Sequence, residues 1–336
     1  MNSKSPPTLD PVALQRFKAL QNSKNTAWLH EEVGERMIER LKWFKEEPQS
    51  WIDWEPINSG LKGHLSLQKM YPGANVTVIE HNAQRLGQTQ QLLARSWTRN
   101  LLPRIKNSSL MWPGKQRFIL NPDNVSLASL DAPTEQPKEQ PKEQPKEQPK
   151  EQHIEQVGLI WANMLLHLTA QPLDLIKAWH KSLKVGGWVM FSCLGPDTTK
   201  ELREIYNRLG WPAHSHEFTD MHDWGDMLVE SGFSDPVMDM ERITLTYSSP
   251  KSLIADLRSL GRNFHPQRFT SLRGKDWLRV FENNLLTLNT HKSSTELCLP
   301  LTFEIIYGHA FKVAPRIKVA QTTSFSAQDM KAMLKR

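Results

Sequence analysis

The fold is decided by the stretch Trp51-Ile52-Asp53-Trp54-Glu55-Pro56-Ile57-Asn58-Ser59-Gly60. A short apolar strand leads into it and a helical pattern follows it, which is how a doubly wound α/β sheet begins. The turn between such elements normally carries several glycines, because a residue without Cβ accepts positive φ and lets the backbone approach a ligand. Here Gly60 is the one glycine in the stretch, and Trp54, Glu55 and Pro56 fill the place of the others. The stretch therefore predicts an α/β fold with an altered ligand loop.

Strand-like and helical segments alternate along the chain. We expect strands over 50–54, 76–79, 117–120, 157–161 and 188–192, and helices over 10–45, 60–71, 86–97 and 172–183, with Gly186-Gly187 ending the last of these helices. Strands spaced by helices form parallel βαβ units with right-handed crossovers. The prediction is a Rossmann-like, doubly wound and mostly parallel sheet, with helices on both faces and a small C-terminal helical cap region.

The 336 residues predict one domain over 28–320, with an N-terminal segment over 1–27 and a C-terminal tail over 321–336. Within the domain, residues 133–152 read Pro-Thr-Glu-Gln followed by four copies of Pro-Lys-Glu-Gln. A proline at every fourth residue blocks a helix, and the lack of apolar side chains leaves nothing to bury. We expect this tract to be an extended surface insertion.

Composition and charge narrow the class of protein. There is no apolar run of 18 residues and no apolar N-terminal leader, and the two cysteines give neither a disulfide framework nor a zinc site. We therefore expect a cytoplasmic protein without a membrane partner or a metal. Residues 1–250 carry 28 basic and 30 acidic side chains, whereas residues 251–336 carry 14 and 6, a net charge of +8. Without an RNA-binding or zinc-finger pattern, this basic region favours an acidic protein partner, or a solvated face, over nucleic acid.

Polar residues follow several of the expected strands. Ligands of doubly wound sheets bind beyond the carboxyl ends of the strands. Glu80 ends the second strand, where a carboxylate about 20 residues past the glycine loop can accept the ribose hydroxyls of an adenosine. Asn163 follows the fourth strand. Asp197 follows the fifth, where either Asp197 or Thr198 is also placed to cap a helix starting near Lys200.

Beyond these patterns, long strings of the sequence resemble the malonyl-[acyl-carrier protein] O-methyltransferase family of biotin synthesis. The strings in its second half are Gly186-Gly187, Phe191-Ser192, Gly195-Pro196-Asp197-Thr198, Glu201-Leu202-Arg203, Asp220-Met221-His222-Asp223, Gly232-Phe233, Asp235-Pro236-Val237-Met238-Asp239-Met240-Glu241 and Leu245-Thr246-Tyr247. Glu31 to Met37 is similar to the helix before that family's first strand, and Leu299 to His309 to its C-terminal strand. The resemblance covers almost the whole chain apart from the tract and the tails.

The resemblance implies S-adenosyl-L-methionine as the cofactor and locates its contacts. They fall on Asp53, Gly60, Glu80, Asp123 and Asn163. The chain departs from the family at several of these places, since the glycine-rich loop is reduced to Asp53 and Gly60, and Asp123 is displaced by one position. The acidic residue of the fourth strand is Gly158, and the family's N-terminal Tyr-Asp pair has no counterpart near 26–28.

The reaction that the resemblance implies is methyl transfer to a carboxylate. Because a carboxylic acid titrates near 4, the nucleophile is already ionised at neutral pH, and no general base or other catalytic side chain is expected. Alignment and a cation that holds the carboxylate suffice. The substrate-side candidates are Asp197, His222, Arg258 and Arg262. The alternatives are a solvated helical face for the two arginines and a packing or capping role for His222.

Two functional hypotheses follow. The first is an S-adenosylmethionine-dependent methyltransferase that acts on a short diacid carried by an acidic acyl carrier protein, which docks on the basic region 251–336. The second is a catalytically inactive descendant that keeps the fold and acts as a binding or accessory protein. The altered loop predicts a dissociation constant for S-adenosylmethionine weaker than about 100 μM.

Overall fold

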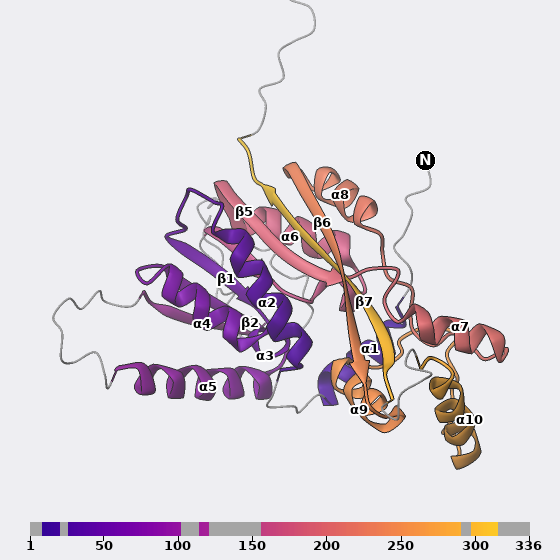
Figure 1. The fold of residues 1–336 in the computed structure, drawn as a ribbon. Helices are drawn as coiled ribbons and strands as arrows, with labels where there is room; N and C mark the ends of the chain where they lie inside the picture. Colours follow the sequence, from indigo (N-terminus) through magenta and orange to yellow (C-terminus); the bar gives the residue numbers. More distant parts are fainter. Residues whose placement is uncertain (1–8, 21–25, 102–113, 121–155, 290–296, 315–336) are drawn as a thin grey trace, which may run out of the picture.

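The computed structural model describes residues 9–20, 26–101, 114–120, 156–289 and 297–314 (Figure 1). Its sheet contains the strands β1 (Ser50–Trp54), β2 (Asn75–Glu80), β3 (Gln116–Leu120), β4 (Val157–Ala162), β5 (Leu183–Leu194), β6 (Ser234–Tyr247) and β7 (Leu299–Phe311). Within the described part of the chain their order is β3-β2-β1-β4-β5-β7-β6. The first five strands pair in parallel, and β7 runs antiparallel to both β5 and β6. The predicted α/β sheet is confirmed.

The strand order shows at which edge of the sheet a ligand would bind. The chain moves outward from β1 to β2 and β3, then returns to β4 on the other side of β1. This reversal between β1 and β4 is the topological switch point, where the loops beyond the two strands diverge and leave a crevice for ligands. The residues that follow β1, β2 and β4 therefore define the candidate site.

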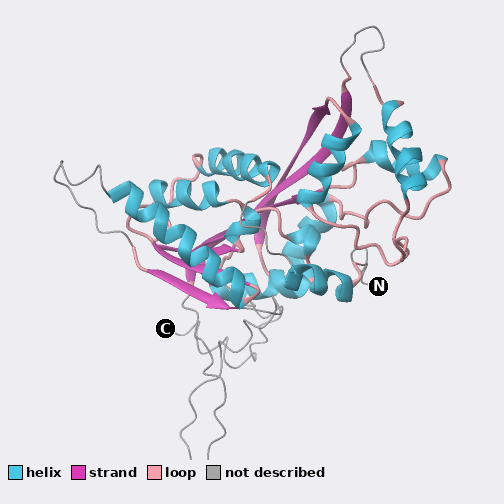
Figure 2. Cartoon of the chain, turned by 90° about the horizontal axis from the view of Figure 1, so that it is seen from below, coloured by secondary structure: helices cyan, strands magenta, loops and turns pink. Residues whose placement is uncertain are grey.

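Helices cover the sheet on both sides, as the view from below shows (Figure 2). The described helices are α1 (Pro11–Leu20), α2 (Trp28–Leu41), α3 (Pro56–Ser59), α4 (Leu61–Met70), α5 (Ala83–Leu101), α6 (Pro172–Ser182), α7 (Lys200–Arg208), α8 (Met221–Glu230), α9 (Pro250–Leu260) and α10 (Lys275–Leu286), with a short 3₁₀ helix at Leu166–Leu168. None of the described helices is both long enough and apolar enough to cross a bilayer.

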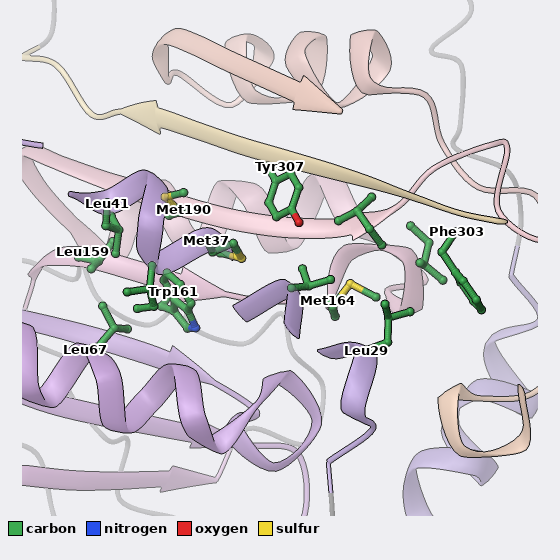
Figure 3. Close-up of a cluster of buried hydrophobic side chains, with 14 of the residues drawn as sticks. Leu29, Met37, Leu41, Leu67, Leu159, Trp161, Met164, Met190, Phe303 and Tyr307 are labelled. Atoms are coloured by element: carbon green, nitrogen blue, oxygen red, sulfur yellow. The ribbon is translucent and has the colours of Figure 1, made fainter. Parts of the chain in front are cut away.

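The core has two halves because the side chains of β5 alternate between the two faces of the sheet. Trp188 and Met190 belong to the half that packs under α2 and α4, whereas Val189 and Phe191 belong to the half under α6 and α8. Figure 3 shows the first half, in which Trp161 of β4 lies close to the helical residue Leu67. Both faces of the central strands are buried, as parallel sheets require.

Three element predictions were wrong. The helix expected over 10–45 is two helices, α1 and α2, and residues 21–25 between them lie outside the described residues. Gly186-Gly187 does not end a helix but lies inside β5, which starts at Leu183 and is offset against β4 by a register shift. The helix α7 starts at Lys200 as expected, but its N-cap is Thr199, and no side chain caps it.

Two sequence features lie outside the described residues. One is the Pro-Lys-Glu-Gln tract over 133–152, and the other is Asp123, the candidate beyond β3. Both features belong to the connection between β3, an edge strand of the sheet, and β4, its central strand.

Candidate functional site

The turn after β1 is a helical turn rather than an open loop. Glu55 leaves the strand in the left-handed conformation, with φ 55° and ψ 57°, and Pro56 then begins the short helix α3. Proline suits this first position because its φ is preset for a helix and its missing N–H would have no helical partner. Trp54 does not fill the loop as expected, since it points into the core against Trp179, with ring centroids 6.0 Å apart. The residue that takes the ligand side of the turn is Glu55.

The Glu55 side chain is buried, with 1% of the residue exposed, and it is surrounded by polar groups of the chain. Its Oε1 lies 3.4 Å from Nζ of Lys18, and its Oε2 lies 3.4 Å from Nδ1 of His81. Asn58 donates a hydrogen bond of 2.7 Å to Oε2. Burial alone would raise the pKa of Glu55, but the charges of Lys18 and His81 hold it well below its usual value. A charged carboxylate is therefore stabilised inside the turn.

Glu80 is the expected ribose-binding carboxylate, and it lies completely buried at the end of β2. Its Oε1 accepts a hydrogen bond of 2.6 Å from the Thr89 hydroxyl on α5. Its Oε2 has no hydrogen-bond partner among the described residues. Burial raises the pKa of Glu80 to about 7, and the charge of Glu55 adds to the shift. One oxygen of Glu80 is thus enclosed in the protein without a hydrogen-bond donor among the described residues.

Asp53 and Gly60 have structural partners. The Asp53 carboxylate lies 2.7 Å from Nδ1 of His64 on α4, and both side chains are fully buried, so this pair joins β1 to α4. Burial raises the pKa of Asp53 although His64 opposes the shift. Gly60 has a φ of 117°, and a Cβ there would lie 3.2 Å from the Glu31 carboxylate and 3.3 Å from the His30 carbonyl. Glycine is needed at this position for its backbone conformation and for the close approach of α2.

Asn163, just beyond β4, has its amide fully used inside the protein. Its Nδ2 donates to the carbonyl oxygens of His30, at 2.8 Å, and of Ser59. Its Oδ1 accepts a hydrogen bond of 2.6 Å from the Ser192 hydroxyl. The side chain therefore joins α2, α3, β4 and β5 at the switch point.

The helix α1 crosses this region and was not expected to contribute to the site. At its start, the Asp10 amide donates to the Phe264 carbonyl at 2.9 Å, and the Asp10 carboxylate pairs with Arg268 at 2.8 Å. In its middle, Phe17 packs edge-on against Phe264 with centroids 5.3 Å apart. Near its end, Lys18 pairs with Glu55. The helix α1 therefore joins the segment after α9 to the turn after β1.

Three buried histidines lie beside this crossing, and sequence reasoning did not select them. They are His30, whose Nδ1 lies 2.6 Å from the Asn58 carbonyl, and the pair in which His216 Nε2 lies 3.1 Å from the His167 carbonyl. Burial lowers the pKa of all three, to about 4 for His216, so they are neutral near pH 7. In the described part of the chain no group of His, Cys, Asp and Glu is arranged to hold a metal ion.

The substrate candidates are distributed over the other half of the sheet. Asp197 pairs with Arg242 at 2.9 Å, and its amide donates to the Glu304 carboxylate at 2.6 Å. His222 is exposed at the start of α8, and its Nδ1 lies 2.6 Å from the carboxylate of Asp220, which is the residue that caps this helix. None of the described contacts joins these residues to Asp53, Glu80 or Asn163.

The two arginine candidates belong to the end of α9. Both Arg258 and Arg262 are exposed. Nη1 of Arg262 donates to the carbonyl oxygens of Arg258, at 2.6 Å, and of Gly261, at 2.7 Å. This arrangement satisfies carbonyl groups at the helix end, so one face of the Arg262 guanidinium is committed to the backbone.

A separate cavity of about 520 Å³ lies toward the beginning of β5. Trp188 and Met190 line it together with Phe44 and Phe311. None of the sequence-predicted site residues lines this cavity, so it belongs to a different part of the molecule from the switch point.

The described residues at the switch point do not fit a bound S-adenosylmethionine in this conformation. The polar groups that would contact its methionine end are buried, and each is bound to another group of the chain: Glu55 to Lys18, His81 and Asn58, and Asn163 to the backbone. At the ribose end, Oε2 of Glu80 has no hydrogen-bond partner among the described residues, but it too is completely buried. In this conformation the polar groups expected at the methionine end are thus bound by other groups of the chain.

Comparison with known proteins gives a consistent result. A malonyl-[acyl-carrier protein] O-methyltransferase of Nitrosospira multiformis is 34% identical over 295 residues, which cover 87% of this chain and 85% of that protein. One of Gallionella capsiferriformans is 32% identical over 304 residues, which cover 89% of each. In structure the chain is similar to the YcgJ protein of Bacillus subtilis, with a TM-score of 0.50 and 10% identity over 84% of this chain and 99% of that one. This last likeness concerns the fold. No protein-family model matches the chain.

Proposed function

The chain belongs to the malonyl-[acyl-carrier protein] O-methyltransferase family, and we propose that it methylates the free carboxylate of a short diacid held as a thioester on an acyl carrier protein. As a member of this family it is a methyltransferase that uses S-adenosylmethionine. The single observation that supports the substrate is the identity of 32–34% over nearly the full length of relatives with that name. We place the reaction in the cytoplasm, because the sequence has two cysteines, too few for the disulfide framework of a secreted protein.

Methyl transfer to a carboxylate requires the protein mainly to align the cofactor with the acceptor. The acceptor carboxylate is ionised at neutral pH and needs no general base. A guanidinium that binds the carboxylate with two parallel hydrogen bonds would hold it in place. Arg258 is our proposed contact, since it is exposed on α9, whereas Arg262 already donates to backbone carbonyls. The assignments of Asp197 and His222 to the substrate side remain proposals.

An acidic carrier protein is the proposed partner of the basic surface on and after α9. The exposed cations there include Arg258, Arg262 and Lys275. Arg268, although basic, pairs with Asp10 and fixes α1, so it is not a suitable position for testing docking. Charge complementarity of this kind mainly raises the rate of association and is screened by salt.

The test is transfer of a labelled methyl group from S-adenosylmethionine, at millimolar concentration, to malonyl-acyl carrier protein. We expect a base-labile methyl ester on the malonyl carrier and no label on acetyl-acyl carrier protein, which lacks the free carboxylate. Replacing Arg262 and Lys275 together by glutamate, with the proposed carboxylate contact Arg258 kept, should raise KM for the carrier at least about tenfold at low salt, because like charges then face each other.

Two results would contradict this function. Label on the acetyl carrier would show that the acceptor is not the carboxylate. Absence of label on the malonyl carrier, with carrier binding intact, would favour the catalytically inactive accessory protein instead.

A further inference from the structure

The contact between Lys18 and Glu55 joins two segments that are far apart in the sequence. The Lys18 ammonium belongs to α1 and the Glu55 carboxylate to the turn after β1, and their side chains are 15% and 2% exposed. The same residue of α1 is held a second time, because its carbonyl lies 3.1 Å from Nε2 of His81 and accepts a hydrogen bond of 3.3 Å from Asn82. The end of α1 is thus fixed to the residues that follow both β1 and β2.

The cation at Glu55 resembles the positively charged groups of the cofactor. S-adenosylmethionine carries a positive amino group and a positive sulfonium, and both would enter beside the turn after β1. In the structure a positive group already occupies this position, supplied by the chain itself. The Glu55 carboxylate is already compensated from within the chain, by Lys18 and by His81, so a positive group of the cofactor would have to compete with Lys18 for it.

The backbone of Glu55 has a conformation that favours glycine. A φ of 55° is unusual for a residue with a side chain and is strained relative to glycine. A Gly-x-Gly-x-Gly sequence laid over 55–59 would place its first glycine here, at the residue whose backbone already has a glycine-like conformation. Glu55→Gly therefore removes the carboxylate without asking the backbone to change.

We propose that the Lys18–Glu55 pair is an intramolecular lock that closes the cofactor site, and that S-adenosylmethionine enters only when the pair opens and α1 withdraws. This inference rests on the proposed function, since it takes the family cofactor as the ligand. The structure is the closed state, in which Lys18 pairs with Glu55 and α1 is held by Phe264 and Arg268.

The experiment is a calorimetric double-mutant cycle with S-adenosylhomocysteine, which has the same amino group and adenosine as the cofactor. The full-length chain is compared with Glu55→Gly, Lys18→Ala and the double variant, and Glu204→Gln serves as the control because Glu204 is exposed. We expect each single variant to bind at least about tenfold more tightly than the unmodified chain. The double variant should bind no more tightly than Glu55→Gly, because Lys18 has nothing to lock once the carboxylate is gone.

Unchanged affinity in both single variants, or effects that simply add in the double variant, would overturn the lock. Thermal unfolding of each variant confirms that it folds. Should Lys18→Ala fail this check, Lys18→Met replaces it, because methionine keeps most of the apolar stem without the charge. Methyl transfer to the carrier is measured separately. Tighter binding without transfer would contradict the proposed function and leave the lock standing, and transfer without tighter binding would do the reverse.

Discussion

Glu55 and Glu80 are two buried carboxylates whose environments separate their pKa values. Lys18 and His81 hold Glu55 ionised, whereas burial and the charge of Glu55 raise the pKa of Glu80 to about 7. Two neighbouring carboxylates repel each other when both are ionised, so the pKa of one of them is raised. The pair therefore carries one negative charge under mildly acidic conditions and acquires the second as the pH passes neutrality.

The raised pKa of Glu80 predicts how stability depends on pH. In the unfolded chain its pKa is near 4.5 and in the folded chain about 7, so its contribution is fully present below 4.5 and is lost as the pH rises through 7. Glu80→Gln removes the titration and can still accept from Thr89. Between pH 5 and pH 8, the unfolding free energy of the unmodified chain should fall by about 1–3 kcal/mol more than that of the variant. Urea unfolding at four pH values measures this, and parallel curves would show that Glu80 does not titrate as described.

Sequence reasoning located some residues of the site and missed others for a definite reason. Glu80 and Asn163 directly follow buried strands, and parallel strands bring their carboxyl ends to one edge, so their positions could be predicted. Lys18 comes from a helix whose docking depends on contacts with the distant Phe264 and Arg268, which no local pattern reveals. The mistake about Trp54 has a similar origin, since the side chains of a strand alternate and its indole points into the core.

At the scale of elements, the strands were predicted more reliably than the turns. Apolar, β-branched runs such as Val76 to Ile79 define buried strands by composition alone. The predicted end of the helix at Gly186-Gly187 was wrong, because these glycines lie in an irregular stretch of β5. The helix α3 was not predicted, since a four-residue helix is too short to show a hydrophobic periodicity. Pro56 indicates a helix start only when the strand before it is known to end at Trp54.

At the scale of the whole molecule, α1 changes the description of the chain. The sequence predicted a domain over 28–320 with a separate N-terminal segment, and the described part of that segment contacts Glu55, in the turn after β1, and Arg268, in the segment after α9. The helix α1 therefore joins the turn after β1 to the segment after α9.

The Pro-Lys-Glu-Gln tract belongs to the same scale, because it lengthens the connection from the edge strand β3 to the central strand β4. We predict that replacing 133–152 by a short Gly/Ser loop leaves the fold and the melting temperature unchanged within a few degrees, because loop length has a small entropic cost. Its composition gives it nothing to pack with. Calorimetric melting of the two chains tests this, and a larger drop would show that the tract packs on the body.

The central claim is that this family member has closed the methionine half of its cofactor site with its own side chains. The most direct measurement is the dissociation constant of the unmodified, full-length protein for S-adenosylmethionine by isothermal titration calorimetry. We predict a value weaker than about 100 μM, which corresponds to a binding free energy smaller than roughly 5.5 kcal/mol. A dissociation constant in the low micromolar range would contradict the account, because the cofactor would then bind without having to displace Lys18 from Glu55.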